Sequence, residues 1–247
     1  MNSYLLLIVA ALGAGLLNAV AGGGSFLTFP ALVFTGVPSI IANATSTVAL
    51  MPGVIASAWA YRREFGGLHI IPLKAAVAAS IAGGITGALL LLYTSQKTFD
   101  LIIPWLLLAA TVVFAIGPRI TTVLKRKSWI GPKTLIVLQF LLGIYGGYFG
   151  GAVGIIMLAA WTLAGLRDIH AMNAGRTLLG GIMNAAAIVL FIAAGKVWWP
   201  QAGVMLVAAV SGGYAGARVA RRVNPSRVRA AIIVVSVLVT IAFFRRV

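Results

Sequence analysis

Two glycine-rich runs interrupt long apolar stretches of this chain, and we expect backbone groups to be available for binding there. Residues 21–25 (AGGGS) lie within the apolar segment 4–36, and residues 146–154 (GGYFGGAVG) lie within the segment 134–165. A helix that breaks inside a membrane leaves N–H groups free at the start of its second half, and these groups, with the helix dipole, bind anions. Close packing of glycines between helices is the alternative. We predict anion-binding backbone at Gly22, Gly23, Gly24 and Ser25, and at Gly150 and Gly151.

Polar side chains stand just inside the helix that we expect after each break. The first half of the chain places Asn43, Thr45 and Ser46 there, and the second half places Asn173 and Arg176. Because burying such groups in lipid costs free energy, we expect them to face a cavity inside the helix bundle. The guanidinium of Arg176 would neutralise an anion with forked hydrogen bonds. The alternative is that Arg176 extends to the membrane surface.

Two further polar residues of the second half leave alternatives open. Asn184 shares a helix face with Asn173, and it either lines the cavity or hydrogen-bonds a neighbouring helix. Because histidine side chains in general titrate near neutral pH, one interpretation of His170 is a proton relay. The other interpretation of His170 is an interfacial residue at a helix start, with Asp168 capping that helix.

The composition places these residues in a membrane. Apolar residues make up 61% of the 247 residues and charged residues 9%, and apolar runs long enough to cross a bilayer follow one another. The net charge of +16 comes from Lys and Arg in short loops, so we attribute it to membrane topology and to anionic lipid, not to nucleic acid. The sequence has no cysteine, and we find no metal-ligand cluster, no paired carboxylates and no nucleotide-phosphate loop. We therefore predict no enzyme activity, no metal and no cofactor.

The elements that position these residues form two similar halves. We expect an all-α polytopic membrane protein with about eight membrane segments, at 4–36 (broken), 39–61, 68–93, 99–118, 134–165 (broken), 169–194, 197–217 and 229–244. Matching residues recur at a spacing of about 128 to 130: Gly15 with Gly143, Gly23 with Gly151, Asn43 with Asn173, Pro72 with Pro200, and glycines 83, 84 and 87 with glycines 212, 213 and 216. We predict one membrane domain of two repeats, 1–118 and 134–247, joined by the basic cytoplasmic linker 119–133. The glycines near 83–87 and 212–216 have the spacing of helix-packing residues.

The loop charges favour repeats of opposite orientation. If each broken segment enters and leaves on one side as a re-entrant hairpin, 15 of the 19 Lys and Arg residues fall on one side and 4 on the other. If every segment crosses once, the division is 11 against 8. Because cytoplasmic loops collect Lys and Arg, the charges favour inverted repeats with six full crossings, two hairpins and both termini outside. Arg245 and Arg246 then lie on the less basic side. Eight single crossings, two of them broken, are the alternative.

The ordered motifs resemble the sulfite exporter TauE/SafE family, also called the toluene-sulfonate uptake permease family. The resemblance rests on residues 15–25 (GLLNAVAGGGS), 42–53 (ANATSTVALMPG), 146–151 (GGYFGG), 173–176 (NAGR), Asn184 and 212–221 (GGYAGARVAR), and it covers nearly the whole chain. Two positions depart from the family pattern. Many relatives have lysine at the position of Arg176. Relatives also often have more glycine at the positions where this chain has Ala152 and Val153.

The resemblance implies a bacterial inner-membrane, multi-pass carrier of sulfur-containing anions such as sulfite, sulfonates or sulfoacetate. With the polar residues above, it predicts a secondary transporter that works by alternating access, with a proton or another ion as a possible coupling partner. The rival interpretations are an anion channel and a non-transporting membrane subunit associated with sulfur metabolism. The sequence determines neither the exact substrate, the direction of transport nor the oligomeric state.

Overall fold

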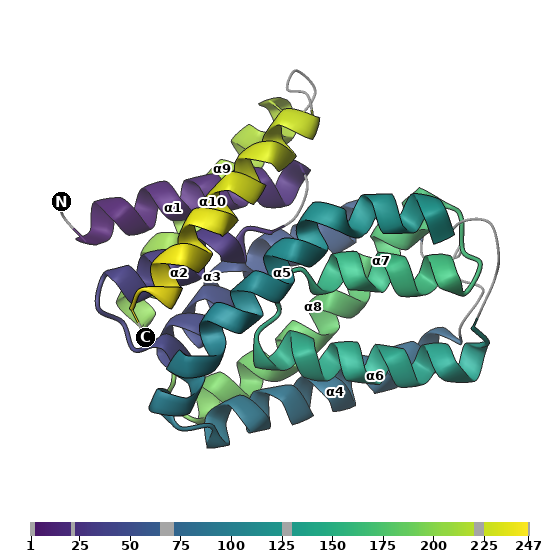
Figure 1. Cartoon of the computed structure of the whole chain (residues 1–247), viewed down its shortest axis with the longest axis horizontal. Coiled ribbons are helices and arrows are strands. Elements are labelled where there is room, and N and C mark those ends of the chain that lie inside the picture. The colour runs from purple at the N-terminus through teal and green to yellow at the C-terminus, as the bar shows by residue number, and fades with distance from the viewer. Residues whose placement is uncertain (1–2, 21–22, 65–71, 125–129, 220–224, 247) are drawn as a thin grey trace. The chain divides into compact units, whose positions relative to one another are not determined.

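The chain folds into α-helices throughout the residues that the computed structural model describes, which are 3–20, 23–64, 72–124, 130–219 and 225–246 (Figure 1). These ranges contain ten helices and no strand. The helices are α1 (Ser3–Val20), α2 (Ser25–Phe34), α3 (Ser39–Ala60), α4 (Leu73–Tyr93), α5 (Gln96–Leu124), α6 (Pro132–Tyr148), α7 (Val153–Leu163), α8 (Ile169–Ala193), α9 (Trp199–Val219) and α10 (Pro225–Phe244).

Both expected breaks are present, and the second is shorter than the sequence suggested. The segment 4–36 divides into α1 and α2, and the segment 134–165 divides into α6 and α7. The expectation that Gly146 and Gly147 belong to the second break was wrong, because both lie inside α6 and the break comprises residues 149–152. Gly143, Gly146 and Gly147 have the i, i+3, i+4 spacing of one helix face, which suits packing against a neighbour.

The linker between the predicted halves is also partly helical. We expected a helix to end at residue 118, but α5 continues to Leu124, and α6 begins at Pro132. Pro132 suits a first helical position because its missing N–H has no partner to lose there. Residues 119–124 of the predicted linker 119–133 are thus helical, and its residues 125–129 lie outside the described residues.

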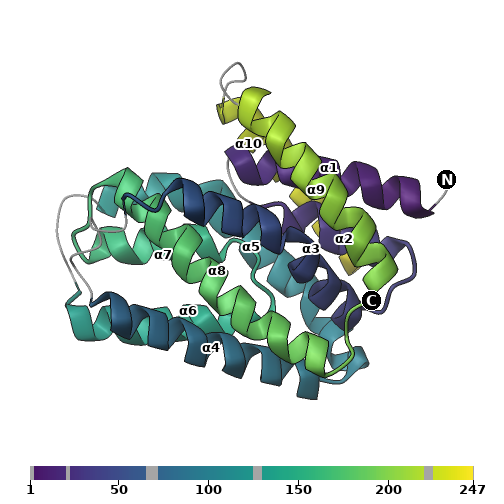
Figure 2. The same ribbon diagram turned by 180° about the vertical axis from the view of Figure 1, so that it is seen from behind.

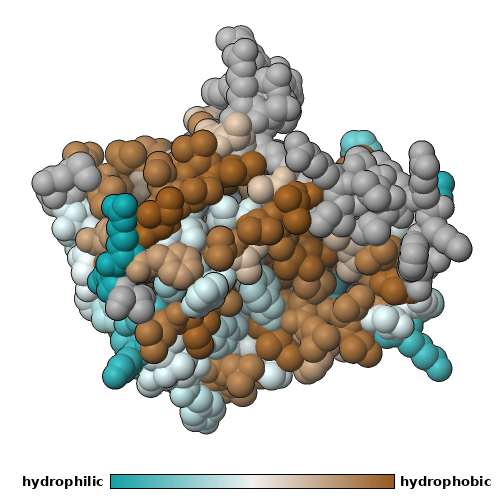
Figure 3. All heavy atoms as spheres, viewed as in Figure 1, coloured by the Kyte–Doolittle hydropathy of each residue, from teal (hydrophilic) through white to brown (hydrophobic). Residues whose placement is uncertain are grey.

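Apolar surface and helix length agree with a multi-pass membrane protein. Among the described residues, Ser39–Ala60, Leu73–Tyr93, Gln96–Gly117 and Ile169–Ala193 are long and apolar enough to span a bilayer. Large apolar side chains such as Leu5, Val9, Leu101 and Trp105 are exposed, and on the face shown in Figure 3 apolar side chains form broad outward-facing areas. Such an extended apolar surface is uncommon on soluble monomers and fits contact with lipid.

Two compact units divide the chain, and each contains one break. Unit 1 comprises Met1–Gly53, Leu92–Thr111 and Phe191–Val247, and unit 2 comprises Val54–Leu91 and Val112–Leu190. Each unit thus takes helices from both predicted repeats. A compact unit and a sequence repeat are different divisions of a chain, so the two repeats stay a prediction.

Glycines join α1 to α9 inside unit 1, where the two helices lie side by side (Figures 1 and 2). A β-carbon added to Gly15 would lie 2.7 Å from the backbone nitrogen of Gly213, and one added to Gly212 would lie 2.8 Å from Cα of Leu12. Side chains at these positions would prevent the two backbones from approaching so closely. The predicted packing role of Gly212 is confirmed.

In unit 2, glycines likewise permit close backbone contact between α4 and α6. A β-carbon added to Gly83 would lie 2.8 Å from Cα of Gly143, and one added to Gly147 would lie 3.0 Å from Cα of Gly84. The packing role predicted for Gly83 and Gly84 is therefore confirmed. The helix before each break, α1 or α6, is thus in close backbone contact with a second helix, α9 or α4. These contacts fix the position at which each break begins.

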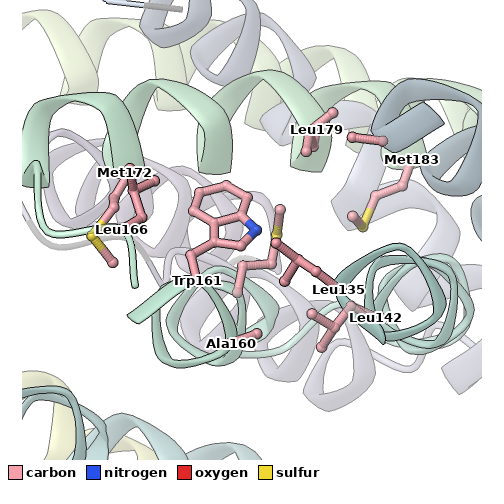
Figure 4. Packing of buried hydrophobic residues seen from close by; sticks show 10 residues of the cluster. Leu135, Leu142, Ala160, Trp161, Leu166, Met172, Leu179 and Met183 are labelled. Carbon is pink, nitrogen blue, oxygen red and sulfur yellow. The ribbon is translucent and has the colours of Figure 1, made fainter. Parts of the chain in front are cut away.

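An apolar cluster in unit 2 fixes the helices around the second break. Trp161 of α7 is 1% exposed and lies among leucines and methionines of α6 and α8 (Figure 4). Met183 of α8 belongs to this cluster and also covers Gly146 of α6. Because buried aromatic and aliphatic side chains supply most packing free energy, the cluster fixes α7 between α6 and α8.

Candidate functional site

The first break is held by a side chain from the end of α1. The backbone N–H of Gly24 donates to Oδ1 of Asn18 at 2.8 Å, and the N–H groups of Phe26 and Leu27 donate to the carbonyls of Gly23 and Gly24. Gly23 has a left-handed φ of 91°, which glycine adopts without strain. The predicted donor at Gly24 is therefore occupied by Asn18 in this structure. Gly22 lies outside the described residues.

The polar residues of α3 are also paired within unit 1. The hydroxyls of Ser46 and Thr28 lie 2.6 Å apart, which joins α3 to the first turn of α2. The hydroxyl of Thr45 accepts the backbone N–H of Trp198 at 3.1 Å, just before α9. Asn43 is 5% exposed and also has an interaction partner. Ser46 thus connects α3 to α2, and Thr45 connects α3 to the residue before α9, so both hydroxyls are paired with protein groups.

Tyr145 organises the second break in unit 2. Its carbonyl accepts the N–H groups of Phe149 and Gly150 at 2.9 and 3.0 Å, and its hydroxyl donates to the carbonyl of Gly151 at 2.6 Å. The rings of Tyr145 and Phe149 pack edge to face. One residue therefore ties down three consecutive residues of the break.

Two left-handed residues shape this turn. Gly150 has a φ of 78° and Ala152 a φ of 59°. The left-handed region costs a residue with a β-carbon roughly 1–2 kcal/mol, so Ala152 is strained where glycine would not be. The Tyr145 hydrogen bonds offset this strain.

The second break leaves backbone donors open at the start of α7. Within the part of the chain that the structure describes, the N–H groups of Gly151, Ala152 and Gly154 make no hydrogen bond. The eleven residues of α7 add the partial positive charge of a helix N-terminus. Free N–H groups at such a point are a common anion-binding arrangement.

Arg176 brings a full positive charge to the same place. A β-carbon added to Gly154 would lie 2.6 Å from Cδ and 3.6 Å from Nε of Arg176, so the arginine side chain runs across the first turn of α7. Arg176 is half-buried and has no hydrogen bond or ion pair with any residue of the described ranges. The phenol of Tyr61, just after α3, is close enough to interact with it electrostatically.

One face of α8 continues this polar surface. Asn173, Arg176, Gly180 and Asn184 follow one another at spacings of three and four residues, which places them on the same helix face. Asn173 and Asn184 are half-buried, and their amides make no hydrogen bond with described residues. The space above Gly180 is open, since an added β-carbon would meet no atom within 4 Å.

The polar atoms on this face of α8 are not fully buried. In the described residues, the buried side-chain atoms without a hydrogen-bond partner belong to Glu64, Gln139 and Ser236, and none belongs to the α8 face. An unpaired polar group facing lipid would cost free energy, so this face suits a water-filled space.

Asp168 accepts the N–H of His170 at 2.9 Å, which confirms its predicted role as the cap of α8.

The predicted site residues divide between the two compact units. Unit 1 contains Gly23, Gly24, Ser25, Asn43, Thr45 and Ser46, and unit 2 contains Gly150, Gly151, Asn173, Arg176 and Asn184. Sequence reasoning missed Asn18 and Tyr145, each of which holds a residue six positions later. In both cases a polar side chain before a glycine break stands six residues ahead of the residue that it holds, and this spacing is the sequence signal that points to Asn18 and Tyr145. No group of three or more His, Cys, Asp or Glu residues that would hold a metal occurs in the described ranges.

Comparison with known proteins covers nearly the whole chain. The family model described as sulfite exporter TauE/SafE matches residues 7–243. The chain is 30% identical over 236 residues to the probable membrane transporter protein YfcA of Escherichia coli strain K12, which covers 95% of this chain and 87% of that protein. A probable membrane transporter protein of Haemophilus influenzae is 26% identical over 228 residues, 92% of this chain and 89% of that protein. The probable membrane transporter protein ORF9 of Sinorhizobium sp is 29% identical over 237 residues, 95% and 90% of the two chains.

Proposed function

Because the chain belongs to the sulfite exporter TauE/SafE family of membrane transporters, we propose that it is a secondary transporter of small anions. Sulfite, sulfonates and sulfoacetate are the substrates to test first, and the transport cycle is alternating access in the bacterial inner membrane. A proton or another ion would supply the driving force.

The guanidinium of Arg176 lies beside the start of α7 and makes no hydrogen bond or ion pair with a described residue, and this observation carries the proposal. Its side chain lies against Gly154, and the neighbouring N–H groups of Gly151 and Ala152 have no described partner. An oxyanion has several acceptor oxygens and would take both the forked guanidinium donors and the backbone donors. Charge-assisted hydrogen bonds of this kind contribute roughly 1.5–3 kcal/mol each.

The open face of α8 suits the approach of such an anion. The half-buried amides of Asn173 and Asn184 supply neutral donors on either side of Arg176 along the helix. Donors without a net charge orient an anion and do not hold it so tightly that it cannot leave. At the first break, in unit 1, Asn18 occupies the backbone N–H of Gly24.

Two contacts inside unit 1 support the inverted topology over eight single crossings. Nη1 of Arg246 donates to the carbonyl of Val33 at 3.3 Å, so the C-terminal end of the chain meets the C-terminal end of α2. With eight single crossings these ends would lie on opposite sides of the membrane. The Trp198 N–H bonded to Thr45 similarly joins the start of α9 to the first turns of α3. A re-entrant first segment places the two partners of each contact on the same side of the membrane.

Helix length supports the hairpins as well. The ten residues of α2 and the eleven of α7 span roughly 15 and 16 Å at about 1.5 Å per residue, which is about half of a hydrocarbon core near 30 Å thick. Their partners α1 and α6 have 18 and 17 residues. The same long and short pairing in both halves is what inverted repeats would produce.

A ligand screen on the purified protein tests the proposal. Sulfite, sulfate, thiosulfate and small sulfonates are added one at a time, and the apparent melting temperature is measured, because a ligand that binds the native state raises stability. We expect one of these anions to raise the melting temperature and Arg176→Ala to weaken its binding by at least about tenfold. Arg63→Ala, which removes an exposed arginine, is the matched control.

Flux measurements in liposomes then separate the rival functions. A transporter gives saturable flux and counterflow of the bound anion, a channel gives conductance without counterflow, and a non-transporting subunit gives neither. The anion-site proposal fails if no anion shifts the melting temperature, or if Arg176→Ala leaves the response to a true ligand unchanged.

A further inference from the structure

Tyr145 makes contacts at the second break that go beyond packing. Its backbone carbonyl receives two consecutive N–H groups, and its hydroxyl reaches forward six residues to the carbonyl of Gly151 at 2.6 Å. The ring packs against Phe149 without help from the hydroxyl. The hydroxyl therefore has one identifiable task, which is to hold the Gly151 carbonyl.

Holding that carbonyl also fixes a donor. The C=O of Gly151 and the N–H of Ala152 belong to one trans peptide, in which the two groups point in opposite directions. The hydroxyl of Tyr145 thus directs the Ala152 N–H away from itself. That N–H has no partner among the described residues and lies one residue before α7.

The peptide would not keep this orientation unaided. Ala152 has a φ of 59°, a conformation in which a residue with a β-carbon is strained. Without the Tyr145 hydrogen bond, Ala152 would relax toward the ordinary right-handed or extended regions, and its N–H would turn. The backbone strain at Ala152 therefore acts against the hydrogen bond from Tyr145 to the neighbouring residue, Gly151.

We propose that Tyr145 is a positioning residue that presets the backbone donors of the second break for the anion held by Arg176. This inference rests on the proposed function, and it adds a residue whose side chain need not touch the substrate. Arg176 supplies the independent sign of a ligand, because its guanidinium lies at the same helix start and makes no hydrogen bond or ion pair with a described residue.

Tyr145→Phe tests the inference, because it removes the hydroxyl and keeps the ring. We expect the affinity for the anion found in the screen to fall about tenfold, which corresponds to roughly 1.4 kcal/mol. The melting temperature without anion should change little, while amide hydrogen exchange in residues 151–154 should become faster. Tyr93→Phe is the matched control, since Tyr93 is 87% exposed at the end of α4.

A second substitution separates positioning from general support. Ala152→Gly removes the backbone strain, so the hydrogen bond from the Tyr145 hydroxyl is needed less to hold the peptide. Tyr145→Phe should therefore reduce anion affinity less in the Ala152→Gly background than in the native protein. If Tyr145→Phe alone does not yield folded protein, the inference requires the double variant to fold and bind the anion. An equal loss of affinity in both backgrounds, or failure of the double variant to bind, overturns it.

Arg176→Ala, measured beside these variants, distinguishes the two possible failures. If Arg176→Ala loses binding while Tyr145→Phe binds and exchanges like the native protein, the positioning role is wrong and the anion site stands. If Arg176→Ala also binds like the native protein, the proposed anion site is wrong, and the positioning role with it.

Discussion

The side chain of Arg176 on α8 lies across Gly154 in the first turn of α7. A β-carbon on Gly154 would lie 2.6 Å from Cδ and 2.9 Å from Cγ of the arginine, so the absence of a side chain at position 154 permits this contact. The contact brings a guanidinium to the positive end of a helix dipole, where two positive groups repel. An anion between them would turn this repulsion into attraction.

Gly154→Ala should weaken anion binding while leaving both the charge and the fold in place. The new β-carbon would displace the flexible arginine side chain, not a backbone segment. We expect about a tenfold rise in the dissociation constant, or roughly 1.4 kcal/mol, measured by ligand-induced thermal shift. Gly203→Ala on α9, where an added β-carbon meets no atom within 4 Å, is the control and should bind normally.

The double variant shows whether Gly154 acts through Arg176. In the Arg176→Gln background, Gly154→Ala should have almost no further effect, because the side chain that it displaces no longer carries the charge. Additive losses from the two substitutions would mean that Gly154 matters for another reason.

Gly180→Leu should block transport and keep the protein folded. The space above Gly180 is open, and the residue shares its helix face with Asn173, Arg176 and Asn184. A leucine would fill that space, so flux into liposomes should fall at least about tenfold with little change in melting temperature. Gly203→Leu, also made in open space, should transport normally. Normal flux through Gly180→Leu would place the open space outside the substrate path.

The helix order and the breaks followed from the sequence because they depend on local signals. Apolar runs of membrane length predicted the long helices, and glycine clusters predicted where two of them divide. The small-xxx-small spacing of the glycines in residues 83–87 and 212–216 also predicted packing, which the structure confirms for Gly83, Gly84 and Gly212. Gly146 and Gly147 were assigned wrongly, because composition alone does not distinguish a helix-packing glycine from a break.

The polar contacts of the site were harder to predict because they join distant residues. Thr45 pairs with the N–H of Trp198, 153 positions away, and Ser46 pairs with Thr28. Sequence patterns select polar residues at suitable helix positions but do not say which group each one meets. Thr45 and Ser46 therefore read as substrate ligands from the sequence, while the structure shows hydrogen bonds to protein groups.

Asn18→Asp should distinguish the first break from the second. The Asn18 amide accepts the Gly24 N–H, and a carboxylate in its place would pair with the same donor and with the dipole of α2. If the first break takes part in anion binding, the new negative charge should lower affinity about tenfold or more, while the melting temperature holds or rises. Native-like affinity would restrict the anion to the second break. Asn18→Ala, which frees the donor without adding charge, is the comparison.

Single cysteines should report the proposed topology directly, because the chain has no cysteine of its own. Ser3→Cys, Pro38→Cys and Arg63→Cys place a thiol at the first residue of α1, between α2 and α3, and after α3, at exposed positions. A re-entrant first segment puts residues 3 and 38 on one side and residue 63 on the other. Eight single crossings would put residues 3 and 63 together and residue 38 opposite. A membrane-impermeant maleimide, applied to intact cells and to inverted vesicles, measures the side of each thiol. We expect residues 3 and 38 to react in intact cells and residue 63 to react only in inverted vesicles, because the loops richest in Lys and Arg should face the cytoplasm. Labelling of residue 38 on the side opposite to residue 3 would refute the hairpin.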